Sequence, residues 1–359
     1  MIRGDACASI ADVTAPGAPA GTGDDHRFIS VLLEEAAPEL NGPRPDAWFD
    51  RLEQEDDRLG EALEWCLKHD PELGRAVGGA VWPFWMNRGR IPEGRQWLDR
   101  LLAAPTVEPR TLARARALYG AGTLAFVQGD GDSALPLHQE SLAIAEELGD
   151  QEAVADALIG LARVALLAGD TKEMRRRSEQ SLALARESGL ERTTAQALHH
   201  LVEAMRREGD LEAAIPLYHQ SLELQRQLGS ERGVALELHN LGNVERKRGN
   251  LEAAAELLTE SLSIYARLGA SRNLAYCFLG LGNLATAEGD PERAARLIAV
   301  AEKLFEEAGV ALDPDYRDDY ERSKLWAQSA LGDNYDLVND DARTISLEHA
   351  LAYAGRQAS

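Results

Sequence analysis

Apolar residues recur every three or four positions along most of the chain, and glycines interrupt them at a fixed interval. This spacing places the apolar side chains on one face of an α-helix. One glycine series is evenly spaced and a second lies halfway between its members: Gly89, Gly129, Gly169, Gly209, Gly249 and Gly289; Gly149, Gly189, Gly229, Gly269 and Gly309. A fixed period of ~40 residues is typical of proteins built from stacked helical repeats.

Small residues keep the same phase in successive units. The second helix of most units carries an alanine five residues after the glycine: Ala134, Ala214, Ala254 and Ala294. This glycine–turn–alanine phase resembles a tetratricopeptide repeat, although a period of ~40 residues also suits HEAT-type helix pairs. We predict an all-α fold, a tetratricopeptide-like α-solenoid of antiparallel helix pairs that winds into a right-handed superhelix.

The residues beside the glycines predict where each helix ends and the next begins. A glycine after the last turn adopts the left-handed conformation that closes a helix. From Gly129 onward in the first series, the residue after the glycine has a side chain suited to cap the amino end of the next helix: Asp130, Asp170, Asp210, Asn250 and Asp290. Each repeat should therefore consist of a helix, a tight turn and a second helix.

The two ends of the chain depart from the repeat. We expect a disordered tail at 1–25, an N-terminal helical cap with a first atypical repeat at 26–108, five tetratricopeptide-like repeats at 109–309, and C-terminal capping helices at 310–359. Helices outside the regular repeats are predicted at 26–40, 46–69, 71–87, 92–102, 314–331 and 346–353. Five of the six tryptophans lie between positions 48 and 97, where they indicate a bulky cap on the array or an aromatic ligand cage.

Composition limits the classes of function. The 359-residue chain has a net charge of −22, which argues against general nucleic-acid binding because that requires a basic face. Its cysteines, Cys7, Cys66 and Cys277, are few and far apart, as expected of free thiols in a reducing compartment. No apolar run approaches the length of a membrane span, and the first residues lack the apolar core of a secretory signal. We expect a cytoplasmic location and no membrane partner.

Both ends of the chain resemble a known family. Residues 48–65, with Phe84-Trp85 and Glu93-Gly94-Arg95-Gln96-Trp97-Leu98, are similar to the sensor region of STAND-type bacterial regulators. The stretch 344–353 (Thr-Ile-Ser-Leu-Glu-His-Ala-Leu-Ala-Tyr) resembles the segment that closes that region. STAND regulators are large ATPases that often end in a LuxR-type helix-turn-helix. The resemblance extends over about residues 27–355 and implies a tetratricopeptide sensor that receives an inducer or a partner protein and controls an ATPase switch.

The ATPase and DNA-binding parts of that family have no counterpart in this sequence. The chain contains no Gly-Lys pair and hence no G-x-x-x-x-G-K-[ST] phosphate loop. We expect no helix-turn-helix beyond residue 359 and no cofactor. The resemblance therefore implies the sensor module alone, as a free protein or as a fragment of a longer regulator.

Positions that share a phase on the first helices of the repeats form rows of polar side chains. In a solenoid these helices line the concave face, so side chains that packing does not use should point into one groove. The candidate residues for binding a ligand or partner are Tyr119, Thr123, Phe126, Arg163, His199, Glu203, Arg206, His239, Asn243, Arg246 and Asn283. Such a groove suits an extended peptide or a small polar effector, and ordinary solvated side chains explain the rows equally well.

The histidines of these rows allow two further interpretations. His199 and Glu203 share a helical face and His239 follows one repeat later, but helices packed ~10 Å apart hold them too far from one another for a shared ion, so we expect no metal. As an alternative function, the same three residues could serve as acid/base groups of an enzyme whose active site is the groove. No nucleophile motif supports that alternative.

Two short basic runs, 175–177 and 246–248, indicate either solvated helix surface or a patch for an acidic partner. The prediction that fits all of these features is a non-catalytic, regulatory scaffold that binds a protein segment or a small effector in its groove. The expected partner is a peptide segment, an ATPase or regulator, or a small effector, without direct contact to nucleic acid.

Overall fold

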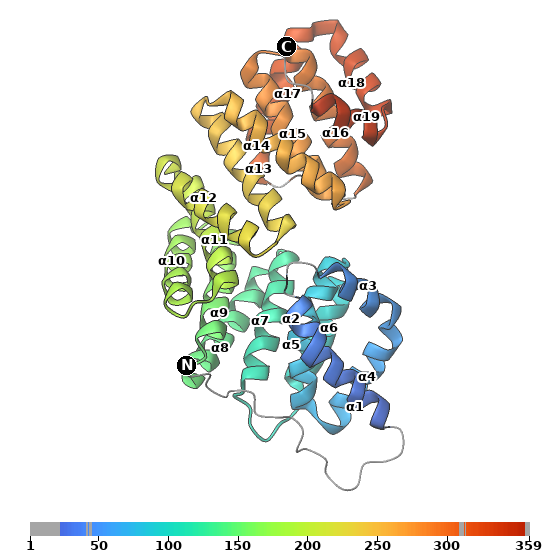
Figure 1. Cartoon of the computed structure of the whole chain (residues 1–359), viewed down its shortest axis with the longest axis vertical. Coiled ribbons are helices and arrows are strands. Elements are labelled where there is room, and N and C mark those ends of the chain that lie inside the picture. Colours follow the sequence, from blue (N-terminus) through green and yellow to red (C-terminus); the bar gives the residue numbers. More distant parts are fainter. Residues whose placement is uncertain (1–21, 41, 43–44, 309–311, 313, 356–359) are drawn as a thin grey trace. The chain divides into compact units, whose positions relative to one another are not determined.

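The computed structural model describes residues 22–40, 42, 45–308, 312 and 314–355, which form helices joined by short connections (Figure 1). No β-strand occurs in this part of the chain, so the prediction of an all-α fold is confirmed. Most of the predicted tail, Cys7 and Gly309 lie outside the described residues. Packing groups the chain into two compact units, Met1–Asp130 and Gly131–Ser359.

The first unit consists of the helices up to α7. They are α1 (Thr22–Val31), the π-helical turn η2 (Leu32–Ala36), α2 (Ala37–Leu40), α3 (Asp46–Gln54), α4 (Asp56–His69), α5 (Pro71–Asn87), α6 (Ile91–Ala103) and α7 (Leu112–Val127). α1 begins before the expected start at position 26. The helix expected over 46–69 is interrupted at Glu55, whose backbone angles (φ −101°, ψ 24°) end α3. α5 begins as predicted because Asp70 caps its amino end and Pro71 suits the first helical position.

Tryptophans fill the packing between the helices of the first unit. Trp85 is fully buried and Trp82 nearly so. Glycines on neighbouring helices make room for them, since a Cβ at Gly94 would lie 2.8 Å from Trp85 and one at Gly120 would lie 2.8 Å from Trp82. The half-buried Trp48, Trp65 and Trp97 each stack on a different partner, namely Arg51, His69 and Arg100. These three tryptophans thus contact separate partners within the first unit.

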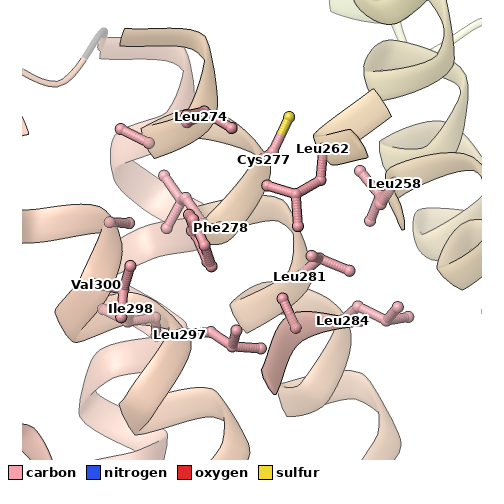
Figure 2. Packing of buried hydrophobic residues seen from close by; sticks show 14 of the residues in the cluster. Leu258, Leu262, Leu274, Cys277, Phe278, Leu281, Leu284, Leu297, Ile298 and Val300 are labelled. Atoms are coloured by element: carbon pink, nitrogen blue, oxygen red, sulfur yellow. The ribbon is translucent and has the colours of Figure 1, made fainter. Parts of the chain in front are cut away.

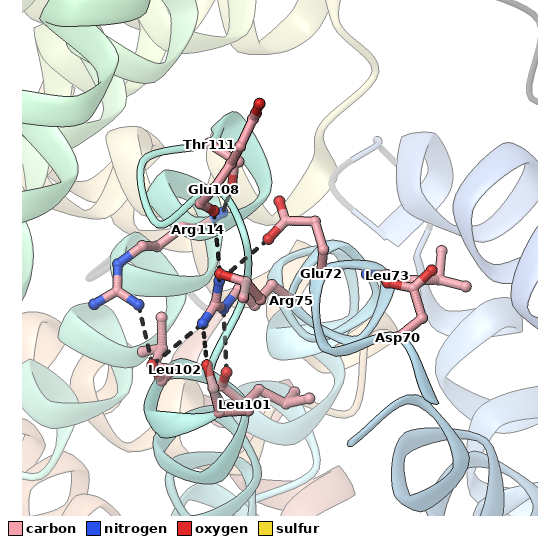
Figure 3. Close-up of polar contacts among 11 residues, drawn as sticks. Asp70, Glu72, Leu73, Arg75, Leu101, Leu102, Glu108, Thr111 and Arg114 are labelled. Atoms are coloured by element: carbon pink, nitrogen blue, oxygen red, sulfur yellow. Dashed lines mark hydrogen bonds and ion pairs between the residues drawn. The ribbon is translucent and has the colours of Figure 1, made fainter. Parts of the chain in front are cut away.

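A buried arginine, Arg75, closes the carboxyl end of α6 (Figure 3). Its guanidinium donates to the carbonyl oxygens of Leu101 at 3.1 Å and Ala104 at 2.6 Å, and to the hydroxyl of Thr106 at 2.7 Å. Carbonyls at the end of a helix have no intrahelical donor, so the arginine supplies one. Arg75 is only 2% exposed, and these acceptors compensate for the burial of its charge.

The second unit continues the repeat as helix pairs. Its segments are α8 (Gly131–Leu148), α9 (Gln151–Leu167), α10 (Thr171–Glu187), α11 (Glu191–Glu208), α12 (Leu211–Gln227), α13 (Glu231–Arg248), α14 (Leu251–Arg267), α15 (Ser271–Glu288), α16 (Pro291–Glu307), α17 (Pro314–Leu331), the 3-10 turn η3 (Gly332–Asn334), α18 (Tyr335–Thr344) and α19 (Leu347–Ala354). From α8 to α17 each helix packs against the next one along the chain. α17 and α19 match predicted helices, whereas α18 has no counterpart among them.

Glycines of both series separate these helices. Every member within the described residues has a positive φ, from 62° at Gly269 to 86° at Gly249. In that left-handed conformation a side chain would crowd the backbone, so glycine is strongly favoured. The predicted turns of the array are therefore confirmed.

The predicted amino-terminal caps are confirmed at some turns and wrong at others. Asp170 and Asp290 each accept a hydrogen bond at 3.0 Å from the backbone N–H three residues onward. Asp210 and Asn250 make no such bond. Asn250 instead donates its amide to Glu245 at 2.6 Å.

Side chains of consecutive helices form the core of the second unit. Figure 2 shows Leu258 and Leu262 of α14 facing Phe278 and Leu281 of α15, with Ile298 of α16 on the other side. All five are at most 3% exposed. The apolar three- and four-residue spacing of the sequence thus corresponds to the surfaces buried between neighbouring helices.

Buried serines join the two helices of a pair. Ser181 Oγ donates to the carbonyl of Ala155 at 2.9 Å, and Ser261 Oγ to that of Ala235 at 2.7 Å. Cys277 is a free thiol beside Ser261, and burial raises the pKa of Cys277 to about 12. Within the described residues, no helix combines the length and the apolar content that crossing a bilayer requires.

Candidate functional site

Most of the candidate residues expected from the sequence lie on the first helices of the second unit. α9, α11 and α13 bury their apolar residues against neighbouring helices, and six of the candidate residues on these helices remain partly exposed. We call the surface of these six residues the first-helix face and define it by Arg163 of α9, His199, Glu203 and Arg206 of α11, and Asn243 and Arg246 of α13. Each of these residues is mostly buried, with a smaller part of it at the surface.

His199 is bound to a buried carboxylate on the next first helix. Its Nδ1 lies 3.0 Å from Glu237 Oε1, and Ser221 Oγ donates to the same oxygen at 3.0 Å. Glu237 is 1% exposed, and its other oxygen has no hydrogen-bond partner among the described residues. Burial lowers the pKa of His199, but the charge of Glu237 and the hydrogen bond to it outweigh burial and give a net rise.

Glu237 was not among the residues expected from the sequence. The repeat contained a signal for it, because the matched positions in other units carry the buried, apolar residues Ala157, Ala197 and Cys277. A lone carboxylate at a position used for helix packing is costly unless polar or charged groups compensate it. His199 and Ser221 provide that compensation, and the structure adds Glu237 and Ser221 to the site.

Arg163 connects α9 to α11 through a second histidine. Arg163 Nε donates to His200 Nε2 at 3.3 Å, which requires an unprotonated nitrogen on the imidazole. Burial, with the charges of Arg163 and His199, lowers the pKa of His200 well below its usual value. The arginine is thus held by a neutral histidine and presents its charge at the first-helix face.

Glu203 pairs with two arginines of its own helix. Its oxygens accept from Arg206 at 2.5 and 2.9 Å and from Arg207 at 2.9 Å. Burial alone would raise the pKa of Glu203, but Arg206 and Arg207 lower it to about 2. Glu203 is therefore a paired carboxylate at neutral pH, which is unsuited to exchange a proton there.

His239 is buried, contrary to the expectation that it points into a groove. It is 3% exposed, and its Nε2 accepts a hydrogen bond from Asn243 Nδ2 at 3.1 Å. Burial, followed by the charge of Arg206, lowers the pKa of His239 to about 4. The same expectation is wrong for Asn283, which is 2% exposed on α15. Packing of α17 against α15, with Tyr316 reaching His239, explains why this part of the row is covered.

Helix α17 also covers Arg246. The ring of Tyr316 lies 4.8 Å from that of Tyr276 and 6.0 Å from that of His239. Three residues later, Asp319 forms an ion pair with Arg246 at 2.7 Å. The Arg246 side chain is only 10% exposed in this arrangement. Part of the first-helix face is therefore occupied by the chain itself.

Three candidate residues belong to the first unit. Thr123 is 2% exposed because α7 packs against both α5 and α6, so the expectation that it lines a groove is wrong. Tyr119 is half-buried, with its ring edge-on to Trp82 at 5.8 Å. Phe126 is half-buried near the end of α7. Tyr119 and Phe126 keep enough exposed surface to remain candidates for binding.

The residues considered for a metal or for catalysis do not act as one group. Among the described residues, no three or more histidine, cysteine, aspartate or glutamate side chains are placed to hold a metal ion. His199 is bonded to Glu237, Glu203 to arginines, and His239 is buried with a lowered pKa. The Ser221 hydroxyl donates to Glu237.

Comparisons with known proteins identify the repeat. The family model described as tetratricopeptide repeat matches residues 113–187, 193–267 and 233–307, which together exceed half of the chain. No curated protein matches the sequence. Among solved structures, a Rap protein complexed with Competence and Sporulation Factor is 15% identical over 91% of this chain and 95% of that chain, with a TM-score of 0.57.

Two further solved structures share the fold. A STAND protein with a tetratricopeptide repeat sensor from Pyrococcus horikoshii is 11% identical over 89% of this chain and 50% of that chain, with a TM-score of 0.53. BtubC from P. vanneervenii is 22% identical over 63% of this chain and 92% of that chain, with a TM-score of 0.50. The resemblance to a STAND sensor region is thus confirmed at the level of fold. From the family model and its extent, the chain belongs to the tetratricopeptide repeat family.

Proposed function

We propose that this protein is a non-catalytic sensing scaffold that binds a protein segment or a small effector on its first-helix face. The observation that carries the proposal is a series of polar links between successive first helices. Arg163 bonds to His200 between α9 and α11, and His199 bonds to Glu237 between α11 and α13. These links hold the partly exposed Arg163 and His199 against the buried His200 and Glu237. Because Arg163 and His199 are already ordered, they lose less conformational entropy when a ligand binds.

A regulatory role is supported by the proteins of similar fold. One was solved with a bound Competence and Sporulation Factor, and another carries its tetratricopeptide repeats as a sensor in a STAND protein. The resemblance of both chain ends to STAND regulators points the same way. We therefore propose that the partner is a regulator, such as an ATPase, and that binding on the first-helix face controls it.

Affinity capture with the intact chain as bait tests this function. Arg163→Ala and Asn243→Ala should each weaken binding of the captured partner by about fivefold or more, equivalent to about 1 kcal/mol. Arg176→Ala and Gln180→Ala make comparable changes at exposed positions on α10 and should leave the affinity unchanged. Dissociation constants measured by calorimetry would provide the comparison.

Stability must be measured alongside binding. The sequence suggested that Arg163 and Asn243 are dispensable for folding, but each is hydrogen-bonded to a buried histidine. We expect each alanine variant to lose about 1 kcal/mol of unfolding free energy and to retain its helical circular dichroism. If both folded variants bind the partner as the wild type does, the first-helix face is not the binding surface, and the tryptophan-rich first unit becomes the better candidate.

A further inference from the structure

The basic run 246–248 contributes cations to two different places. Arg248 binds Glu212 at 2.7 Å, away from the first-helix face. Arg246 and Lys247 both reach Asp319, at 2.7 and 3.4 Å. Asp319 lies 73 positions after Arg246 in the sequence. The ion pairs that the structure shows for Arg246 and Lys247 are thus made with α17, not with their own helix.

Helix α17 reaches further than a regular member of the array. α17 stands where the first helix of another repeat would follow α15. Asp319 is as far along the sequence from Leu279 as Leu279 is from His239, so the three residues occupy matched repeat positions. In a stacked array such a helix contacts its immediate neighbours, and α17 does pack against α15 and α16. Tyr316 and Asp319 nevertheless extend past α15 to His239 and Arg246 on α13.

The contact combines an aromatic and an acidic group on one helical face. Tyr316 and Asp319 are three positions apart, so their side chains leave α17 in similar directions. Asp319 is 16% exposed, and although burial raises its pKa, Arg246 and Lys247 outweigh burial and lower it. Arg246 Nε is buried and has no hydrogen-bond partner in the described part of the chain. The surface can therefore satisfy a carboxylate and retains an unused donor.

We propose that His239, Arg246, Lys247 and Tyr276 form a docking surface for a helical acidic segment with an aromatic residue three positions before its carboxylate, and that α17 fills this surface in the free chain. The proposal rests on the proposed function, because it assigns a partner chemistry to part of the same face. The cations favour an acidic segment although the chain as a whole carries a net charge of −22. A partner must compete with a tethered helix, whose effective concentration is on the order of millimolar.

A labelled synthetic peptide with the sequence of α17 is the probe. In the full chain, the peptide can bind only those molecules in which α17 has left the surface. The apparent affinity of the peptide is therefore its intrinsic affinity multiplied by the fraction of such open molecules. Asp319→Asn in the full chain removes the charge that pairs with Arg246 and raises that fraction. Fluorescence anisotropy should show the peptide binding about tenfold more tightly to this variant than to the wild type. Asp318→Asn makes the same change at the exposed neighbouring position and should bind as the wild type does.

Substitutions in the peptide and in the docking surface test whether Asp319, Tyr316 and Arg246 cause the tenfold gain in affinity. Peptides carrying Asp319→Asn or Tyr316→Ala should lose the tenfold gain, and so should the native peptide when the chain carries Arg246→Gln together with Asp319→Asn. Equal affinity of the native peptide for the Asp319→Asn and Asp318→Asn chains would overturn the proposal. Equal affinity of native and substituted peptides for the Asp319→Asn chain would overturn it as well.

A measurement on the wild-type chain tests the proposal without relying on variants that must fold correctly. Saturating native peptide should increase hydrogen exchange of the amides of α17, because the displaced helix loses its contacts, whereas the Asp319→Asn peptide should not. Unchanged exchange with bound native peptide would contradict the proposal.

The outcomes also separate this inference from the proposed function. If Arg163→Ala weakens the captured partner while Asp319→Asn changes neither partner nor peptide affinity, the scaffold function stands and the docking surface fails. If the peptide results hold while Arg163→Ala and Asn243→Ala leave the captured partner unaffected, the docking surface stands and that partner binds elsewhere.

Discussion

At the scale of single residues, neighbouring histidines of the second unit have opposite protonation preferences. Glu237 raises the pKa of His199, whereas burial dominates for His200 and His239 and lowers the pKa of each. The repeat places His199 and His239 at matched positions, so the sequence suggests one role for both. The difference arises from the neighbours, since one ring faces a carboxylate and the other accepts a bond from Asn243.

His239 predicts a pH dependence of stability. Its folded pKa of about 4 lies below the unfolded value of about 6.5, so its neutral form contributes stability above pH ~6.5 that is lost as the pH falls toward the folded pKa. We expect the thermal midpoint of the wild type to fall between about pH 7.5 and 5.5, and His239→Gln to reduce that fall. His219→Gln, at an exposed position of α12, is the control and should keep the wild-type slope. If the thermal midpoints of the wild type and His239→Gln fall equally with pH, this assignment is contradicted.

At the scale of the helices, the glycine turns are set by backbone conformation. Gly209 ends α11 with a φ of 82°, and a Cβ there would meet no atom within 4 Å. Gly209→Ala should therefore destabilise the protein by about 1–2 kcal/mol through backbone strain alone. Gly131, the first residue of α8, has no positive φ, and its Cβ would lie an ordinary 3.7 Å from Leu167. Gly131→Ala should be neutral or stabilise by up to about 1 kcal/mol. Urea unfolding measures the stability of both variants. If Gly209→Ala and Gly131→Ala change the unfolding free energy equally, backbone strain does not explain the loss expected at Gly209.

Close helix packing in the pairs can be tested at two adjacent alanines of α12. Ala214 is fully buried, and the preceding Ala213 is exposed. Ala214→Leu should overpack the helix interface and cost about 1–3 kcal/mol of unfolding free energy. Ala213→Leu should stay within about 0.5 kcal/mol, because leucine is also a good helix former and the surface accommodates it. A tolerated leucine at 214 would show that the repeated alanine is not needed for close approach.

At the scale of the whole molecule, the chain combines a tryptophan-filled first unit with a second unit of regular pairs. Regular repeats bury surface mainly against their neighbours, so atypical ends are needed to finish such an array. In the second unit that end is α17 to α19, and α17 also occupies part of the first-helix face. The element that finishes the unit is thus the one that we propose a partner displaces.

The sequence alone determined the period, the helix pairs and the turns, because these depend on local rules. A positive φ favours glycine, an apolar three- and four-residue spacing needs a helix, and both signals repeat at the same interval. The same rules did not predict the interruption at Glu55 within an expected helix, and they did not predict α18. Helical phase also selected the six candidates that stay partly exposed in the structure: Arg163, His199, Glu203, Arg206, Asn243 and Arg246.

Only the tertiary structure decided which of those residues are accessible and what holds them. Phase gives a direction around a helix but not what lies opposite, so it could not show that His239 and Asn283 are buried. Glu237 and its bond to His199 depend on the approach of two first helices. The pair between Arg246 and Asp319 joins residues 73 positions apart, and no local pattern encodes a contact of that range. Contacts of this kind depend on how α17 packs, which is a property of the folded array and not of any one repeat.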